Sequence, residues 1–81
     1  MSIKVLFFAT LSDVTGLREA EVDASEHTDV ASIYSRFARQ FPRLEEHRKS
    51  LLCAVNSEFA RPDSPVQDGD EVAFFPPVSG G

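Results

Sequence analysis

The chain has 81 residues and a formal net charge of −5, and 42% of its residues are hydrophobic, including seven phenylalanines. This length and apolar content predict one globular domain and exclude a disordered chain. The acidic net charge argues against nucleic-acid binding, which needs a basic face. Cys53 is the single cysteine, so the chain cannot form an internal disulfide, and this cysteine content is typical of a reducing cytoplasm.

The first predicted element is a strand over residues 3–9, where β-branched and aromatic side chains follow one another. This run is too short to cross a membrane and is interrupted by Lys4, so we expect neither a signal peptide nor a membrane span. Alternation along a strand puts Lys4 and Phe8 on the more exposed face. The opposite face is expected to lie in the core and carries Ile3, Val5 and Phe7.

Residues 10–16 are expected to form a single turn, because they are too few for a full helix. Ser12 or Asp13 can cap this turn, and Gly16 can end it in the left-handed conformation. Residues 17–23 are mostly charged, which predicts an edge strand that deters pairing with other chains. The short spacing predicts that this strand pairs antiparallel with the first one.

The clearest helical signal lies between Thr28 and Pro42. Thr28 or Asp29 is expected to cap the helix, and Pro42 is expected to end it. Apolar side chains recur at i, i+3, i+4, i+7, i+8 and i+11, which predicts one stripe that packs on a sheet. The members of this stripe are Val30, Ile33, Tyr34, Phe37, Ala38 and Phe41.

Residues 43–50 carry mostly charged side chains and are expected to form a solvated connection, with room for a short helical turn. His47 lies in this segment, and His27 lies before the helix. No metal site is expected, because neither histidine has a second histidine or a thiolate nearby at ligand spacing.

Three further strands are predicted, over residues 51–56, 58–60 and 71–75. Gly69 supplies the positive φ of the turn before the last of them. Cys53 lies within an apolar run and is expected to be a small buried hydrophobic residue. In the last strand Val72 and Phe74 are expected to face inward, which leaves Phe75 on the open face.

The order strand, strand, helix, strand, short strand, strand is typical of an α+β β-grasp, or ubiquitin-like, fold. We expect a mixed sheet of four to five strands with one main helix packed on one face. The first and last strands are the most apolar and are expected at the centre of the sheet. The domain is expected to span residues 1–75, followed by an extended tail over residues 76–81.

The tail begins with two prolines, which cannot continue a strand and which favour an extended path. Its residues are Pro76, Pro77, Val78, Ser79, Gly80 and Gly81. At about 3.3 Å per residue, this segment reaches roughly 20 Å beyond the domain. Glycine-rich ends usually fray, whereas the stiff proline pair favours a tail that is aimed at a partner.

Three stretches carry a resemblance to a known family. They are Lys4-Val5-Leu6-Phe7-Phe8-Ala9, Ala54-Val55-Asn56 and, above all, Asp68-Gly69-Asp70-Glu71-Val72-Ala73-Phe74-Phe75-Pro76-Pro77-Val78-Ser79-Gly80-Gly81. With these residues the chain resembles the small, sulfur-carrying subunit of molybdopterin synthase, a ubiquitin-like sulfur carrier. A terminal Gly-Gly alone is also found in ubiquitin-like modifiers and in the thiamine-pathway sulfur carrier. The whole ending from Phe74 onward is specific to the resemblance to the small subunit of molybdopterin synthase.

The resemblance implies that Gly81 is the reacting residue. An adenylating (E1-like) activating enzyme would use ATP to join the Gly81 carboxylate to AMP, and a persulfide sulfur donor would convert the adenylate into a thiocarboxylate. The tail would then enter the large subunit of the synthase, where the sulfur attacks cyclic pyranopterin monophosphate to build the molybdopterin dithiolene. The implied chain is a cytoplasmic, non-catalytic subunit without a bound cofactor, and the implied assembly is a heterotetramer.

Three phenylalanines are candidates for a docking surface beside the tail: Phe8, Phe59 and Phe75. Exposed aromatic side chains make good interface anchors, although packing in the core is open as an alternative for each of them. The acidic residues Asp68, Asp70 and Glu71 are candidates for contact with basic groups of a partner, with solubility as the alternative.

Three alternative functions are open on the sequence alone. The first is a sulfur carrier for another pathway, such as thiamine synthesis or tRNA thiolation. The second is a ubiquitin-like modifier that forms isopeptides with lysines of other proteins. The third is an interaction module with an inert tail, for which deletion of Gly81 would leave pathway activity unchanged.

Overall fold

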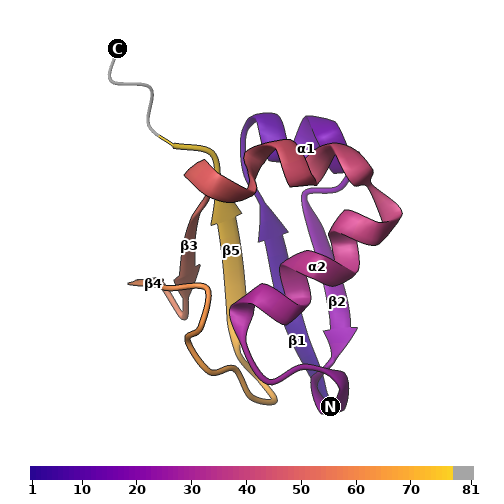
Figure 1. Cartoon of the computed structure of the whole chain (residues 1–81). Coiled ribbons are helices and arrows are strands. Elements are labelled where there is room, and N and C mark those ends of the chain that lie inside the picture. The colour runs from indigo at the N-terminus through magenta and orange to yellow at the C-terminus, as the bar shows by residue number, and fades with distance from the viewer. Residues whose placement is uncertain (78–81) are drawn as a thin grey trace.

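Five strands form one mixed sheet in the computed structural model, which describes residues 1–77 (Figure 1). The strands are β1 Ser2–Phe7, β2 Glu19–Asp23, β3 Leu52–Val55, β4 Glu58–Ala60 and β5 Glu71–Phe75. They lie in the order β2-β1-β5-β3-β4, with β1 and β5 parallel at the centre and the other neighbours antiparallel. The predicted edge strand, the antiparallel first pair and the central first and last strands are therefore confirmed.

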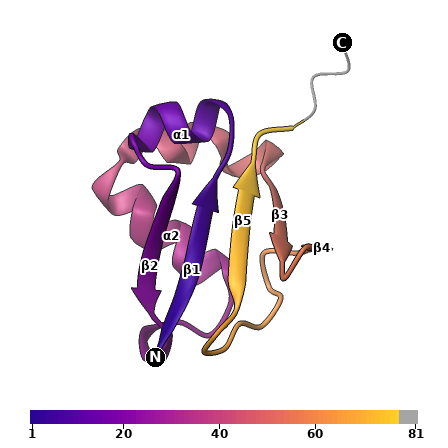
Figure 2. The same cartoon turned by 180° about the vertical axis from the view of Figure 1, so that it is seen from behind.

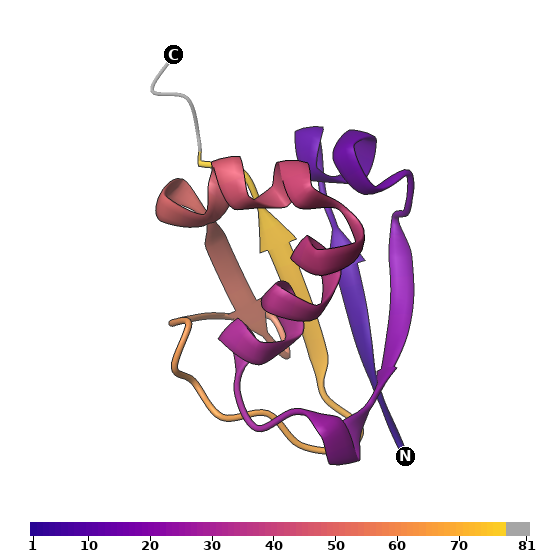
Figure 3. The same cartoon turned by 45° about the vertical axis from the view of Figure 1, so that its right-hand side comes forward.

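Helical segments cover one face of this sheet. They are α1 Thr10–Thr15, η1 Ala24–Glu26, α2 Val30–Gln40 and η2 Pro42–Ser50, of which η1 and η2 are 3₁₀-helices. The main helix α2 lies across the sheet in Figures 1 and 3, and in the part of the chain that is described no helix covers the opposite face (Figure 2). None of the helices within residues 1–77 is long and apolar enough to cross a membrane.

The core lies between α2 and the inward positions of the central strands. Val5 and Val72 are opposite each other in the parallel pair, as are Phe7 and Phe74, and all four side chains are buried. The Phe7 ring meets Phe37 of α2 edge-on, with 5.1 Å between the ring centroids. The predicted strand faces and the helical stripe are confirmed, because the side chains on both sides of this contact are those that the sequence pattern placed inward.

The predicted N-terminal capping residue is confirmed for α2 but not for α1. Asp29 caps α2 by accepting a hydrogen bond of 2.9 Å from the Ser32 amide. In α1 the capping position is Ala9, at φ 52° and ψ −130°, and the Ser12 hydroxyl donates to the Ala9 carbonyl instead of capping an amide. The predicted cap at Ser12 or Asp13 is therefore wrong, whereas Gly16 ends α1 at φ 73° as expected.

The segment predicted as a solvated connection is the 3₁₀-helix η2, which packs against α2. Leu44 is fully buried, and its carbonyl accepts a hydrogen bond of 2.7 Å from the Tyr34 hydroxyl. Burial of Tyr34 raises the pKa of its hydroxyl to about 12. The predicted short helical turn is present within a nine-residue 3₁₀-helix whose side chains are mostly exposed. The burial of Leu44 was not predicted, because one apolar side chain among many charged ones carries no periodicity.

Candidate functional site

The chain leaves the sheet at the end of β5, where the two prolines follow Phe75. Pro76 is half-buried and Pro77 is exposed, and Figures 1 and 2 show the backbone turning outward from the domain at this point. The predicted roles of the remaining tail residues concern Val78, Ser79, Gly80 and Gly81, which lie outside the described residues. The described part thus shows where the tail begins and in which direction it departs.

Three phenylalanines lie together on the open face of the sheet, opposite α2, and we call them the aromatic row: Phe8, Phe59 and Phe75. Phe8 stacks on Phe75 with 5.2 Å between ring centroids, and Phe59 meets Phe75 at 6.2 Å. Phe59 is 81% exposed and Phe8 is 43% exposed, whereas Phe75 is half-buried between them. The open-face positions predicted for Phe8 and Phe75 are confirmed, and Phe59 lies on a short outer strand as predicted. The role of all three in docking stays a prediction.

The aromatic row borders a shallow hollow of about 190 Å³. Ala54 and Ala73, which are opposite each other in the β3–β5 pair, belong to its lining together with Leu6 of β1. Small side chains at the centre of the sheet thus leave space that the surrounding rings enclose. The sequence analysis missed these residues, although alternation along β5 does place Ala73 on the same face as Phe75.

The three acidic residues that were candidates for partner contact, Asp68, Asp70 and Glu71, divide into structural and accessible ones. The Asp70 carboxylate is buried and accepts hydrogen bonds from the Asn56 side-chain amide at 3.0 Å and from the Gln67 backbone at 2.9 Å. Its predicted contact with a partner is therefore wrong, because turn amides already occupy both oxygens. Asp68 is exposed and accepts from the Ser2 amide, and Glu71 is half-buried at the hollow.

Cys53 packs in the core, as predicted. Only 4% of its surface is exposed, and its thiol donates to the Ala60 carbonyl at 3.3 Å. Burial raises the pKa of this thiol, so little reactive thiolate forms at neutral pH. In the described part of the chain, no three His, Cys, Asp or Glu side chains gather in a way that could hold a metal ion.

Comparison with known proteins gives a match to the ThiS family over residues 5–81. The chain belongs to the ThiS family. A relative from Escherichia coli (strain K12), named molybdopterin synthase sulfur carrier subunit, is 45% identical to this ThiS-family chain across 98% of the chain and 99% of the relative. The resemblance predicted from the three stretches is thereby confirmed.

Solved structures confirm that this ThiS-family chain has the ubiquitin-like β-grasp fold. SAMP1 from Haloferax volcanii, a small archaeal modifier protein, matches with a TM-score of 0.80 at 30% identity over the full length of both chains. A complex of subunits 1 and 2 of the molybdopterin-converting factor from Helicobacter pylori contains a chain that matches with a TM-score of 0.68 at 22% identity, again over both full lengths. The second match shows likeness of fold alone.

Within residues 1–77, this ThiS-family chain combines three features on or beside the open face of the sheet. An extended segment leaves the domain, an exposed aromatic row lies next to it, and a hollow opens between the rings. Such an arrangement can bind a protein surface while the segment reaches beyond that surface. The arrangement is better suited to presenting the end of the chain to a partner than to enclosing a small substrate.

Proposed function

We propose that this chain is the sulfur carrier subunit of a molybdopterin synthase and that its C-terminal glycine carries the sulfur. The observation that carries the proposal is the 45% identity, over nearly the whole of both chains, to an Escherichia coli protein with that name. The structure supports it with the outward path of Pro76 and Pro77 next to the aromatic row. The domain then serves to hold a partner, and the tail delivers the reacting group.

The chemistry begins at the Gly81 carboxylate, which is too poor an electrophile to react with sulfur directly. Its oxygen attacks the α-phosphorus of ATP on an activating enzyme, and pyrophosphate leaves. Sulfide can then attack the acyl carbon, with AMP as the leaving group, to give the thiocarboxylate. When the donor is a protein persulfide, the same attack gives an acyl disulfide, and a thiol cleaves its S–S bond to release the thiocarboxylate and a mixed disulfide.

The design of the tail fits this role. Glycine has no side chain, so Gly80 and Gly81 can pass through a channel that a β-carbon would block. Pro76 and Pro77 pre-extend the segment, which lowers the entropy that is lost when it enters a partner. We propose that the acid, base and anion-binding groups come from the partners, so that the carrier acts as a cytoplasmic cosubstrate without a cofactor of its own.

The partner that receives the sulfur is the large synthase subunit in this proposal. The relatives named as sulfur carrier subunits of molybdopterin synthase support such an assembly, and the aromatic row supplies a surface for it. We propose that the large subunit covers the aromatic row while the tail reaches its active site. There the sulfur is transferred to cyclic pyranopterin monophosphate, and a heterotetramer with two carriers is the expected assembly.

Intact-mass analysis tests the proposal directly. The chain is incubated with an activating enzyme, ATP and sulfide, and the expected product is heavier by the exchange of one oxygen for one sulfur, located at Gly81. A variant without Gly81 serves as the control and should stay unmodified. If the full chain gains no sulfur although the activating enzyme converts another carrier under the same conditions, the proposal is wrong.

A second candidate function is that of a protein modifier, which the likeness to the small archaeal modifier SAMP1 favours. It would use the same activated Gly81, but the acceptor would be a lysine amine and the product an isopeptide. Denaturing gels of cells that express a tagged chain distinguish the two, because a modifier gives a ladder of conjugates that resist thiol treatment. A sulfur carrier gives a single band under the same conditions.

A further inference from the structure

The positive charge of the chain is concentrated on its helical side. Residues 36–49 contain five of the eight basic residues but only two of the thirteen acidic ones. Arg48 has a structural role within this segment, because it forms a two-point ion pair with Glu45 and lies over the Tyr34 ring at 5.2 Å. The surplus of positive charge therefore lies in the other basic residues.

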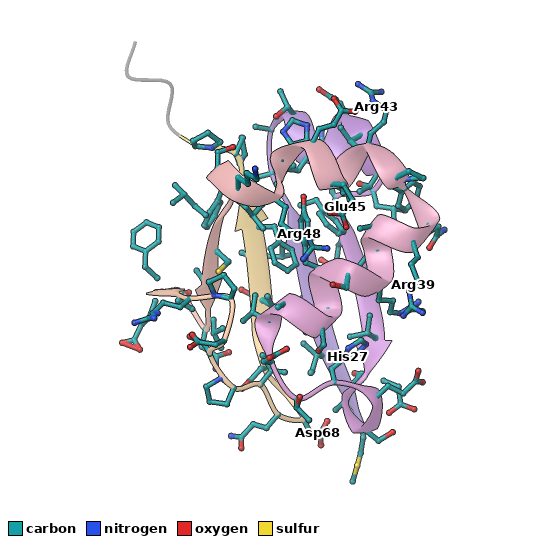
Figure 4. The ribbon with its side chains drawn as sticks, in the orientation of Figure 1. His27, Arg39, Arg43, Glu45, Arg48 and Asp68 are labelled. Atoms are coloured by element: carbon teal, nitrogen blue, oxygen red, sulfur yellow. The ribbon has the colours of Figure 1, made fainter. Side chains whose placement is uncertain are left out.

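Three exposed arginines lie on α2 and at the start of η2, and we call them the arginine ridge: Arg36, Arg39 and Arg43. Arg36 and Arg39 are at positions i and i+3 of α2, which ends at Gln40, and Arg43 follows in η2. Figure 4 shows Arg39 and Arg43 pointing outward from the helical layer, away from the sheet. In the described part of the chain, neither of the two ion pairs involves a ridge residue.

The fold itself does not require this arrangement. Like charges at neighbouring positions of a helix repel each other, and the ridge side chains form no part of the hydrophobic core. Within residues 1–77, no ion pair joins an acidic side chain to these arginines, and Arg36 lies over the Phe37 ring at 5.6 Å. On a chain of net charge −5, three guanidinium groups without a carboxylate partner among the described residues are complementary to an acidic protein surface.

The ridge and the aromatic row lie on opposite sides of the molecule. The row lies on the open face of the sheet and the ridge on α2, which covers the other face (Figures 2 and 4). Arg43 lies at the end of the domain from which the chain leaves β5 (Figure 4). Two proteins can therefore contact the carrier at once, one on each face.

This matters for the order of events in the proposed function, on which the present inference rests. The acyl-adenylate forms on the activating enzyme, so sulfur must arrive while that enzyme still holds the tail. In this inference the activating enzyme contacts the aromatic row at that stage, as the large subunit does later. A protein donor then needs a surface on the other face. We infer that the arginine ridge is the docking surface for the protein persulfide donor, which meets it with an acidic patch outside its own reactive cysteine.

Nucleic acid is a poorer occupant of the ridge. Phosphate recognition along a strand needs many basic contacts, and the ridge provides only three. The rest of the chain carries eleven of the thirteen acidic residues and would repel a polyanion that extends past the ridge.

The test compares two sulfur sources with the same activating enzyme and ATP. Thiocarboxylate formation is followed by mass spectrometry, first with sulfide and then with a rhodanese-type protein that carries a cysteine persulfide, in the presence of a thiol. For the variant R36E/R39E/R43E we expect an unchanged rate with sulfide. With the persulfide protein at subsaturating concentration, we expect a rate that is lower on the order of tenfold, and a wild-type rate that falls as salt is raised.

Matched single variants locate the effect. Arg39→Glu and Arg61→Glu change the net charge equally, and Arg61 is exposed in the loop after β4. We expect only Arg39→Glu to slow the persulfide reaction. If the glutamates disturb α2, the neutral variant R36Q/R39Q/R43Q gives the same comparison of rates with sulfide and with the persulfide protein. Its melting temperature is measured to show that it is folded.

Three results would overturn the inference. An equal loss of rate with both sulfur sources would place the ridge in contact with the activating enzyme, and an unchanged rate with the persulfide protein would remove any role in donor docking. An unchanged rate together with ridge-dependent binding of single-stranded DNA would assign the ridge to nucleic acid. Failure of the wild-type chain to react even with sulfide would instead contradict the proposed function, so the two failures are distinguishable.

Discussion

Phe59 offers the sharpest test of the aromatic row, because nearly all of its side chain is available to a partner. It lies on the short edge strand β4, is 81% exposed, and touches the row through Phe75. Phe59→Ala therefore removes binding surface without opening a cavity in the core. We expect the free energy of unfolding to change by less than about 0.5 kcal/mol.

The effect on binding can be worked out from the exposed area. A phenylalanine side chain offers about 175 Å², and with 81% of it exposed a partner can cover about 140 Å². At about 25 cal/mol per Å², full coverage contributes about 3.5 kcal/mol to the free energy of binding, or about 300-fold in Kd. Partial coverage and side-chain ordering lower this value, so we expect Phe59→Ala to weaken binding by about 10- to 100-fold.

Calorimetry with the large synthase subunit measures this loss. Glu58→Gln is the control, because its side chain lies on the same strand but points to the other side, and its Kd should stay within about twofold of the wild type. A Kd for Phe59→Ala within about threefold of the wild type, with a folded variant, would show that the partner does not cover the row.

Three further predictions concern the domain. Tyr34→Phe leaves the buried Leu44 carbonyl without its donor, and we expect a loss of about 1–3 kcal/mol in denaturant unfolding; a loss below about 0.5 kcal/mol would contradict this. Burial, with the Arg36 charge nearby, lowers the pKa of His27, so folding favours the neutral imidazole. The stability that the neutral imidazole contributes is present above the pKa of about 6.5 in the unfolded chain and is lost as pH falls below that value. Unfolding curves at pH 7.5 and 5.5 should therefore differ more for the wild type than for His27→Asn. Ala9→Gly should stabilise the fold by about 1 kcal/mol, since glycine accepts the backbone angles of this exposed position without strain, and a lower melting temperature would refute it.

Elements with a repeating pattern could be predicted from the sequence. Many side chains contribute to the alternation in β1 and β5 and to the helical period of α2. One side chain that breaks the pattern therefore does not change the type of element that is predicted. The same alternation was enough to place Phe8 and Phe75 on the open face. The row is therefore a consequence of strand parity together with the pairing of the two central strands.

Features that depend on a single long-range contact could not be predicted. Leu44 is buried, and its carbonyl accepts a hydrogen bond from Tyr34, which lies ten positions earlier in the chain. Neither contact can be predicted from a segment of mostly charged residues. The hollow depends on Ala54 being opposite Ala73 across the β3–β5 pair, a register that no local pattern gives. The strained angles of Ala9 likewise follow from the way α1 joins β1, since the residue itself disfavours them.

The place of β5 in the sheet has a consequence for how the protein is made. This strand lies between β1 and β3, so it joins the pair formed by β1 and β2 to the pair formed by β3 and β4. During synthesis the two pairs therefore stay separate until β5 is available to join them. We expect a polypeptide that stops before β5 not to form the five-stranded sheet.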